Sequence, residues 1–250
     1  MELLGRSSRF LNKVLDYLVG LLIILIILYS SYSLYSSYML YRGAYVSDKL
    51  LSLKPEPNQV AGQKPTFEGL KSINKDVIAW VTVDNTNIDH PVLQGKDNLE
   101  YINKDVYGNF AFEGAIFLDT RNRPNFEDRY SLLYGHHMEH GAMFGDLQLF
   151  LEKDFFEKNK TGTLITQDAT YHIDFFAVIQ ADGYDQKVFD PTHVASNADK
   201  NDFLKYIEKM KVHSRDMEIL EDDNLIGLST CTSTQTNGRT ILYGVLRKKP

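Results

Sequence analysis

A single cysteine, Cys231, stands near the end of a chain of 250 residues. It follows an apolar run typical of a β-strand, residues 225–229, and precedes the polar segment TSTQTNG. A cysteine at a strand end can present its sulfur at a cleft, where a thiolate attacks a carbonyl carbon. The competing interpretations are a packing residue, because a free cysteine packs as a small hydrophobic group, and a cysteine that forms an intermolecular disulfide. One cysteine also excludes an intrachain disulfide and a zinc site built on CxxC pairs.

A thiolate that cleaves an amide needs a proton donor for the leaving amine, and histidine is the usual choice. Of seven histidines, three cluster in the segment YGHHMEHGAM as His136, His137 and His140. His136 comes directly after a strand-like run, residues 132–135. We therefore expect that strand to deliver His136 to the rim of a sheet, as the later strand delivers Cys231.

The same histidine cluster permits a metal-binding interpretation. Residues 136–140 match H-x-x-E-H, a zinc-peptidase pattern in which two histidines four residues apart bind zinc from one face of a helix. Gly135 and Gly141 bracket these residues and disfavour the helix that the pattern requires. A zinc peptidase that uses His136 and His140 remains an alternative, and we assign no metal ligand.

Arg239 opens the last strand-like run, eight residues after Cys231. Two strands joined by a short loop would bring both residues within side-chain reach, where a guanidinium can stabilise an oxyanion or hold a substrate carbonyl. The spacing alone also permits a surface arginine paired with an aspartate. A further alternative is a membrane-anchored binding domain without catalytic activity.

The composition indicates a globular domain, with 43% hydrophobic and 24% charged residues. The net charge of −6 offers no broad basic surface for nucleic acid.

Many short apolar runs without regular strand–helix alternation predict a mainly β domain, a barrel or a sandwich, with a hairpin that turns at Asp168-Ala169. The expected strands are residues 77–83, 91–94, 115–119, 132–135, 163–166, 171–181, 225–229 and 240–246. Helical apolar spacing appears at Met143, Leu147, Phe150 and Leu151, and again at Phe203, Ile207 and Met210, after a capping-box pair, Ser196 and Asp199.

The first 65 residues are expected to lie outside the folded domain. Residues 17–41 carry no charge, and these 25 residues exceed the about 20 that a helix needs to cross a bilayer. Arg6, Arg9 and Lys13 predict a cytoplasmic segment 1–16, a transmembrane signal-anchor 17–41 and an extracellular remainder. A cleaved signal peptide is the alternative. Three prolines predict an extended tether over 42–65 and a catalytic domain over 66–250.

Together these residues resemble the sortases, the membrane-anchored cysteine transpeptidases of Gram-positive bacteria. LSTC at 228–231, followed by an arginine at the start of the final strand, is similar to the cysteine signature of that family, and YGHHM is similar to its histidine signature. The run DHPVLQ…DN…Y…GAIFLD over 89–119 looks like the class B version of the early barrel. A helix over 198–213 before the cysteine strand is also similar to a class B trait.

The resemblance implies a closed sortase-type β-barrel with peripheral helices. Cys231 would be the nucleophile, His136 the general acid and base, and Arg239 the cation that stabilises the oxyanion or orients the substrate. Ser229 and Thr230 would contact substrate.

The implied reaction joins a protein bearing a C-terminal sorting signal to an amine of cell-wall precursor or of a pilin subunit. The resemblance implies no cofactor, and no ATP is needed because a thioester intermediate conserves the reactivity of the acyl group. Class B members either polymerise pilins or anchor haem-uptake proteins, and the two kinds use different sorting pentapeptides. The resemblance leaves both roles, and therefore the pentapeptide, open.

Overall fold

The computed structural model describes residues 2–56, 65–231 and 237–249. The chain divides into two units, Met1–Arg42 and Gly43–Pro250. The first unit is one helix, α1 (Glu2–Arg42), and its segment Phe10–Met39 is long and apolar enough to cross a membrane. The second unit contains all the described strands and the remaining described helices.

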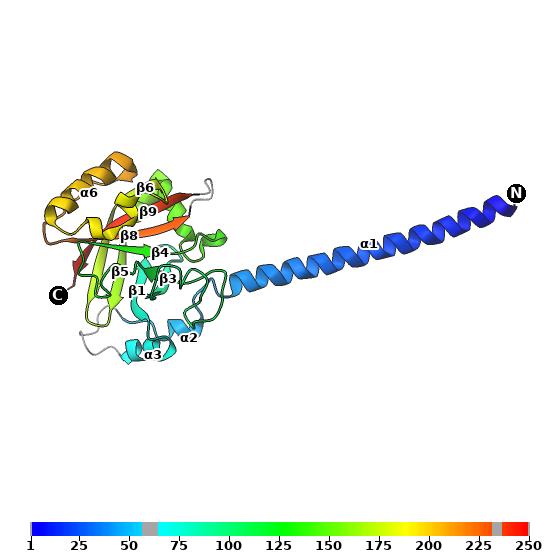
Figure 1. Ribbon diagram of the computed structural model, residues 1–250, viewed down its shortest axis with the longest axis horizontal. Helices are drawn as coiled ribbons and strands as arrows, with labels where there is room; N and C mark the ends of the chain where they lie inside the picture. Colours follow the sequence, from blue (N-terminus) through cyan, green and yellow to red (C-terminus); the bar gives the residue numbers. More distant parts are fainter. Residues whose placement is uncertain (1, 57–64, 232–236, 250) are drawn as a thin grey trace. The chain divides into compact units, whose positions relative to one another are not determined.

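Eight strands of the second unit close into a β-barrel in the order β5–β1–β2–β3–β4–β8–β9–β6, and β6 pairs back to β5 (Figure 1). Within the described residues only β2–β3 and β4–β8 pair in parallel. A short ninth strand, β7, extends the sheet from β6. The prediction of a mainly β, closed barrel is confirmed. The strands are β1 (Val77–Val83), β2 (Asp89–Leu93), β3 (Ile116–Leu118), β4 (Tyr130–Tyr134), β5 (Thr161–Thr166), β6 (Thr170–Asp182), β7 (Lys211–Ser214), β8 (Asn224–Cys231) and β9 (Gly238–Lys248).

Peripheral helices cover the barrel where their sequences carry apolar spacing. The helix α6 (Asn197–Met210) starts with the expected capping box between Ser196 and Asp199. Its Phe203 packs against the rings of Tyr130 and Tyr243 from the barrel wall. The helix ends before the expected residue 213, because β7 takes up the chain from Lys211. The other described helices of this unit are α2 (Asp48–Leu51), α3 (Pro65–Ile73), η1 (Glu139–Gly141), η2 (Gly145–Leu151), α4 (Lys153–Lys158), α5 (Gln186–Phe189) and η3 (Pro191–His193).

The folded unit begins earlier than residue 66, the start expected from the sequence. The chain packs from Gly43 onward: Ala44 and Leu50 are buried, and Leu50 shares a core cluster with Phe67 and Trp80. The prolines of the expected tether begin only at Pro55, so they do not prevent the short helix α2 from forming before them. Residues 43–56 are thus part of the domain. The remainder of the expected tether, residues 57–64, lies outside the described residues.

Candidate active site

The parallel pair β4–β8 brings two of the expected site residues to the same end of the barrel. Tyr134 of β4 is the register partner of Ser229 of β8, and the amide of Gly135 donates to the carbonyl of Ser229 at 3.1 Å. His136 comes two residues after Tyr134, and Cys231 comes two residues after Ser229. Because the strands run in the same direction, both residues emerge at the same edge.

The antiparallel pair β8–β9 brings Arg239 to that edge as well. Thr230 pairs with Thr240, and Cys231 pairs with Arg239. Backbone pairing alone places Cys231, since its side chain lies outside the described residues. At the level of the backbone, therefore, the three expected residues meet where β4 and β8 end and β9 begins.

The imidazole of His136 is half-buried and held by the backbone of another loop. Its Nε2 lies 2.8 Å from the carbonyl oxygen of Ile102. A carbonyl oxygen only accepts, so Nε2 carries the hydrogen and donates it, which leaves Nδ1 free to exchange a proton. The sequence pattern indicated no group to orient His136. A backbone carbonyl has no sequence signal, because every residue carries one.

A glycine allows the Ile102 carbonyl to take this position. Gly114 has φ of +61°, and a Cβ added there would overlap the oxygen of Ile102 and lie 2.7 Å from that of Tyr101. Next to it, Glu113 is buried, and burial raises the pKa of its carboxyl while the nearby His136 opposes that rise. A side chain at 114 would push the carbonyl away from the imidazole.

Arg239 is half-exposed, and its Nη1 donates to the carbonyl of Gly238 at 3.0 Å. Across the ranges that the structure describes, no carboxylate forms an ion pair with it. The surface ion pair considered from the sequence is therefore not found there, and this guanidinium keeps donors for another acceptor.

Ser229 and Thr230 lie in β8 with 1% and 2% of their surface exposed. Their hydroxyls find no hydrogen-bond partner among the described residues. A buried hydroxyl without a partner is costly, and the carbonyl or amide of a bound peptide is one group that can satisfy it. Their expected contact with substrate stays a prediction.

The H-x-x-E-H segment does not form the helix that a zinc site of this type requires. Met138 is extended, residues Glu139–Gly141 form a single 3₁₀ turn, and His140 has φ of +58°. The two histidines thus share no helical face, and in the described parts of the chain no three His, Cys, Asp or Glu side chains are grouped to hold a metal. His137 is half-buried, and burial lowers its pKa. The zinc-peptidase alternative is not supported.

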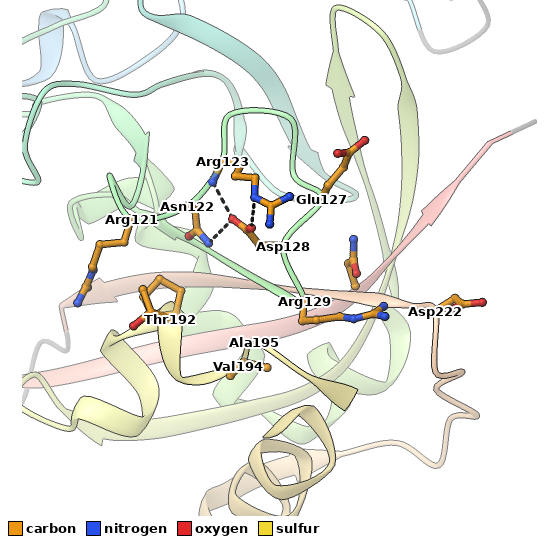
Figure 2. A pocket seen from close by; sticks show the side chains of 12 residues that line it. Arg121, Asn122, Arg123, Glu127, Asp128, Arg129, Thr192, Val194, Ala195 and Asp222 are labelled. Atoms are coloured by element: carbon orange, nitrogen blue, oxygen red, sulfur yellow. Dashed lines mark hydrogen bonds and ion pairs between the residues drawn. The ribbon is translucent and has the colours of Figure 1, made fainter. Parts of the chain in front are cut away.

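A hollow of about 660 Å³ lies at the other end of β4 and β8. Arg129 and Asn224, which line it, lie where these two strands begin, whereas the expected site residues lie where they end. Figure 2 shows Asp128 between Asn122 and Arg123, bonded to both. The hollow is thus separated from the site by the length of the strands.

Comparisons with known proteins agree with this arrangement. A family model described as Sortase domain matches residues 81–247. The chain is 33% identical over 184 residues to Sortase B of Listeria monocytogenes, covering 72% of this chain and 73% of that protein. It is 30% identical over 187 residues to Sortase B of Staphylococcus aureus, covering 74% of this chain and 76% of that protein.

Solved structures give the same result. A class B sortase of Streptococcus pyogenes involved in pilus biogenesis is 43% identical with a TM-score of 0.67, and the match covers 72% of this chain and 97% of that one. A substrate complex of Staphylococcus aureus sortase B is 28% identical with a TM-score of 0.70, covering 81% and 93%.

Proposed function

Because the chain belongs to the sortase family, and to its class B, we propose that its cysteine transpeptidase chemistry is carried out by Cys231, His136 and Arg239. The observation that supports this assignment is the register of three neighbouring strands. Ser229 pairs with Tyr134, and Cys231 pairs with Arg239, so the backbone positions of Cys231, His136 and Arg239 lie at one edge of the barrel.

In the proposed first step, the thiolate of Cys231 attacks the threonine carbonyl of a sorting pentapeptide. The carbonyl oxygen takes the negative charge, and the guanidinium of Arg239 stabilises it. The C–N bond then breaks, His136 gives a proton to the leaving amine, and a thioester remains.

In the second step, an acceptor amine attacks the thioester. His136 removes a proton from this amine, and the amide forms as the thiolate of Cys231 leaves. The bond from His136 Nε2 to the carbonyl of Ile102 supports this role, because it orients the ring and assigns the proton transfers to Nδ1.

Sorting-signal proteins are the substrates of this family, and we infer that the acceptor amine for this chain belongs to a pilin. The likeness to the pilus-biogenesis sortase, at 43% identity, exceeds the 33% and 30% found for the two Sortase B relatives, and this difference supports the inference. Attachment to cell-wall precursor is the other outcome of a test with both acceptors.

We also propose that α1 is retained as the membrane anchor, with residues 1–16 in the cytoplasm and the barrel outside. The segment Phe10–Met39, which is long and apolar enough to cross a membrane, supports the role as an anchor, and the basic residues Arg6, Arg9 and Lys13 near the start of the chain support the orientation. The barrel would then lie where sorting-signal proteins and acceptor amines emerge.

The test is to incubate the full chain in detergent with a panel of sorting peptides and to measure its intact mass. We expect a thioacyl adduct on the wild type and none on Cys231→Ala. His136→Ala should lose turnover, whereas His137→Ala, the matched neighbouring imidazole, should keep it. An adduct that survives Cys231→Ala, or turnover that a chelator abolishes, would contradict the proposal.

A further inference from the structure

An ordered hairpin between β2 and β3 carries aromatic side chains into solvent. We call residues 103–112 the aromatic hairpin. Lys104 bridges to Phe110, and the amide of Ala111 donates to the carbonyl of Asn103 at 3.0 Å. At the tip, the Asp105 carboxylate accepts bonds from the amides of Tyr107 and Asn109. These bonds join the two arms of the hairpin and close its tip.

The phenylalanines of this hairpin are among the most exposed large apolar residues of the folded unit. Phe110 is 69% exposed and Phe112 is 65% exposed, and their rings meet edge to face at a centroid distance of 5.0 Å. Tyr107 on the same hairpin is 42% exposed. Rings held in water by an ordered hairpin gain free energy when they enter an apolar or interfacial phase.

The hairpin lies beside the first residues of the folded unit. A Cβ added to Gly43 would overlap the carboxylate of Glu113, which directly follows the hairpin. The hydroxyl of Tyr107 lies 3.2 Å from that of Ser47. The hairpin that carries the exposed rings therefore lies next to residues 43–47.

Chain continuity limits how far the hairpin can lie from a bilayer that α1 spans. The apolar segment ends at Met39, and the folded unit begins at Gly43. The few residues between them cover at most about 14 Å even when fully extended. The headgroup region on each side of the hydrocarbon core is about 5–8 Å thick. Residues next to Gly43 are thus within reach of the interface, where aromatic side chains are enriched.

We propose that the aromatic hairpin binds the headgroup region of the outer leaflet through Phe110 and Phe112. This inference rests on the proposed role of α1 as a retained anchor. The binding is apolar and does not require anionic lipid, because Lys104 is neutralised by Glu100 and the hairpin tip carries Asp105. Since the hairpin follows Ile102, whose carbonyl holds His136, lipid binding also fixes the catalytic end of the barrel near the membrane.

The test exploits the single native cysteine. In a Cys231→Ala background, Asn109→Cys places one label at the hairpin tip, and Leu220→Cys places a control label on an exposed loop before β8. The full chain is labelled with an environment-sensitive dye and reconstituted in phosphatidylcholine bilayers with nitroxide headgroup lipid. We expect quenching at 109 at least about twofold stronger than at 220, as for groups that bury about 5–10 Å into the interface.

The double substitution Phe110→Ser and Phe112→Ser separates ring binding from proximity. It should reduce quenching at 109 to the level at 220, with thermal unfolding of the barrel unchanged because both rings are exposed. Quenching that is equal at both labels, or that survives loss of the rings, overturns the proposal.

Flotation of the same labelled chain with liposomes separates the role of α1 from that of the hairpin. A chain that fails to float shows that α1 is not an anchor, and the proposed membrane attachment falls together with the role of the hairpin. A chain that floats but shows no selective quenching at 109 is consistent with α1 as an anchor and overturns only the proposed lipid binding by the aromatic hairpin.

Discussion

Cys231 and Arg239 are direct partners in the antiparallel pairing of β8 and β9. Directly opposed residues of such a pair have Cα atoms about 4.5–5.5 Å apart, which is well within the length of an arginine side chain. The backbone of Arg239 thus lies next to that of Cys231, as the proposed role of Arg239 in stabilising the oxyanion requires. The proposed role of Arg239 can be tested by measuring both the turnover and the thermal unfolding of its variants.

Replacing Arg239 should reduce catalysis without unfolding the barrel. We expect Arg239→Ala to lower kcat/KM by about 10²–10³-fold, as for the loss of an oxyanion donor. Arg239→Lys keeps the charge but loses the planar fork, so its activity should fall between those of the wild type and Arg239→Ala. Steady-state kinetics with a sorting peptide and a thermal melt provide the measurements.

Arg247 is the matched control, because it lies on the same strand and forms ion pairs with Asp174 and Asp223. Arg247→Ala should lower the melting temperature and leave turnover near that of the wild type. Wild-type turnover by Arg239→Ala would remove Arg239 from the mechanism.

Substituting Gly114 should affect catalysis through the carbonyl of Ile102. An alanine there is strained at φ of +61° and overlaps this oxygen, so the acceptor of His136 has to move. We expect turnover to fall at least about tenfold, within the contribution of general acid–base catalysis. Gly108→Ala is the control, because Gly108 has φ of +82° but no atom within 4 Å of the added Cβ. Equal turnover in the two variants would show that the hydrogen bond between His136 and the carbonyl of Ile102 does not contribute to catalysis.

Local signals in the sequence were enough to predict much of the barrel. The strand β1 has the expected bounds, and the hairpin of β5 and β6 turns where Asp168-Ala169 indicated. Each of these features depends on residues close together in the chain. The capping box of α6 is another local signal, and it is confirmed.

Other features depend on contacts that no local pattern encodes. The parallel pairing of β4 with β8 joins Tyr134 to Ser229, a residue far away in the sequence. The bond between His136 and Ile102 relies on a carbonyl and on the conformation of Gly114. The short β7 is largely exposed and lacks the apolar alternation of a buried strand, so its sequence gives little signal.

The stability of the barrel should fall below neutral pH because of His90. This residue of β2 is buried, and burial lowers its pKa to about 4, although the charge of Asp89 opposes the effect. The unfolded chain, with a histidine pKa near ~6.5, binds the proton more readily. The contribution of neutral His90 to the free energy of unfolding is therefore complete above pH ~6.5. It is lost as the pH falls toward ~4, by up to about 1.4 kcal/mol per pH unit.

Urea unfolding followed by the fluorescence of Trp80, the only tryptophan, measures this loss between about pH 7 and pH 5, inside the window set by the two pKa values. His90→Leu should show a flatter dependence on pH than the wild type. His193→Leu is the control, because His193 is exposed. If the slopes of wild type and His90→Leu coincide, His90 does not cause the loss.

Lys200 should stabilise the start of β8, at the opposite end from Cys231. Its Nζ donates to the carbonyls of Leu220, Glu221 and Asp223 at 2.8, 2.6 and 2.9 Å, and the residue is 1% exposed. Lys200→Met retains the apolar stem but leaves three carbonyls without their shared donor. We expect a loss of about 3 kcal/mol, since hydrogen bonds to charged groups are the stronger ones.

Thermal melts and kinetics of matched variants distinguish a structural role of Lys200 from a catalytic one. Lys205→Met changes the same residue type on the same helix, but Lys205 pairs with Asp202 at the surface, and its loss should cost less than about 0.5 kcal/mol. Turnover by Lys200→Met at low temperature should remain near that of the wild type. The hydrogen bonds of Lys200 hold the start of β8, whereas the proposed chemistry takes place at the end of β8. A variant that melts normally but turns over slowly would reverse this assignment and connect α6 to the active site.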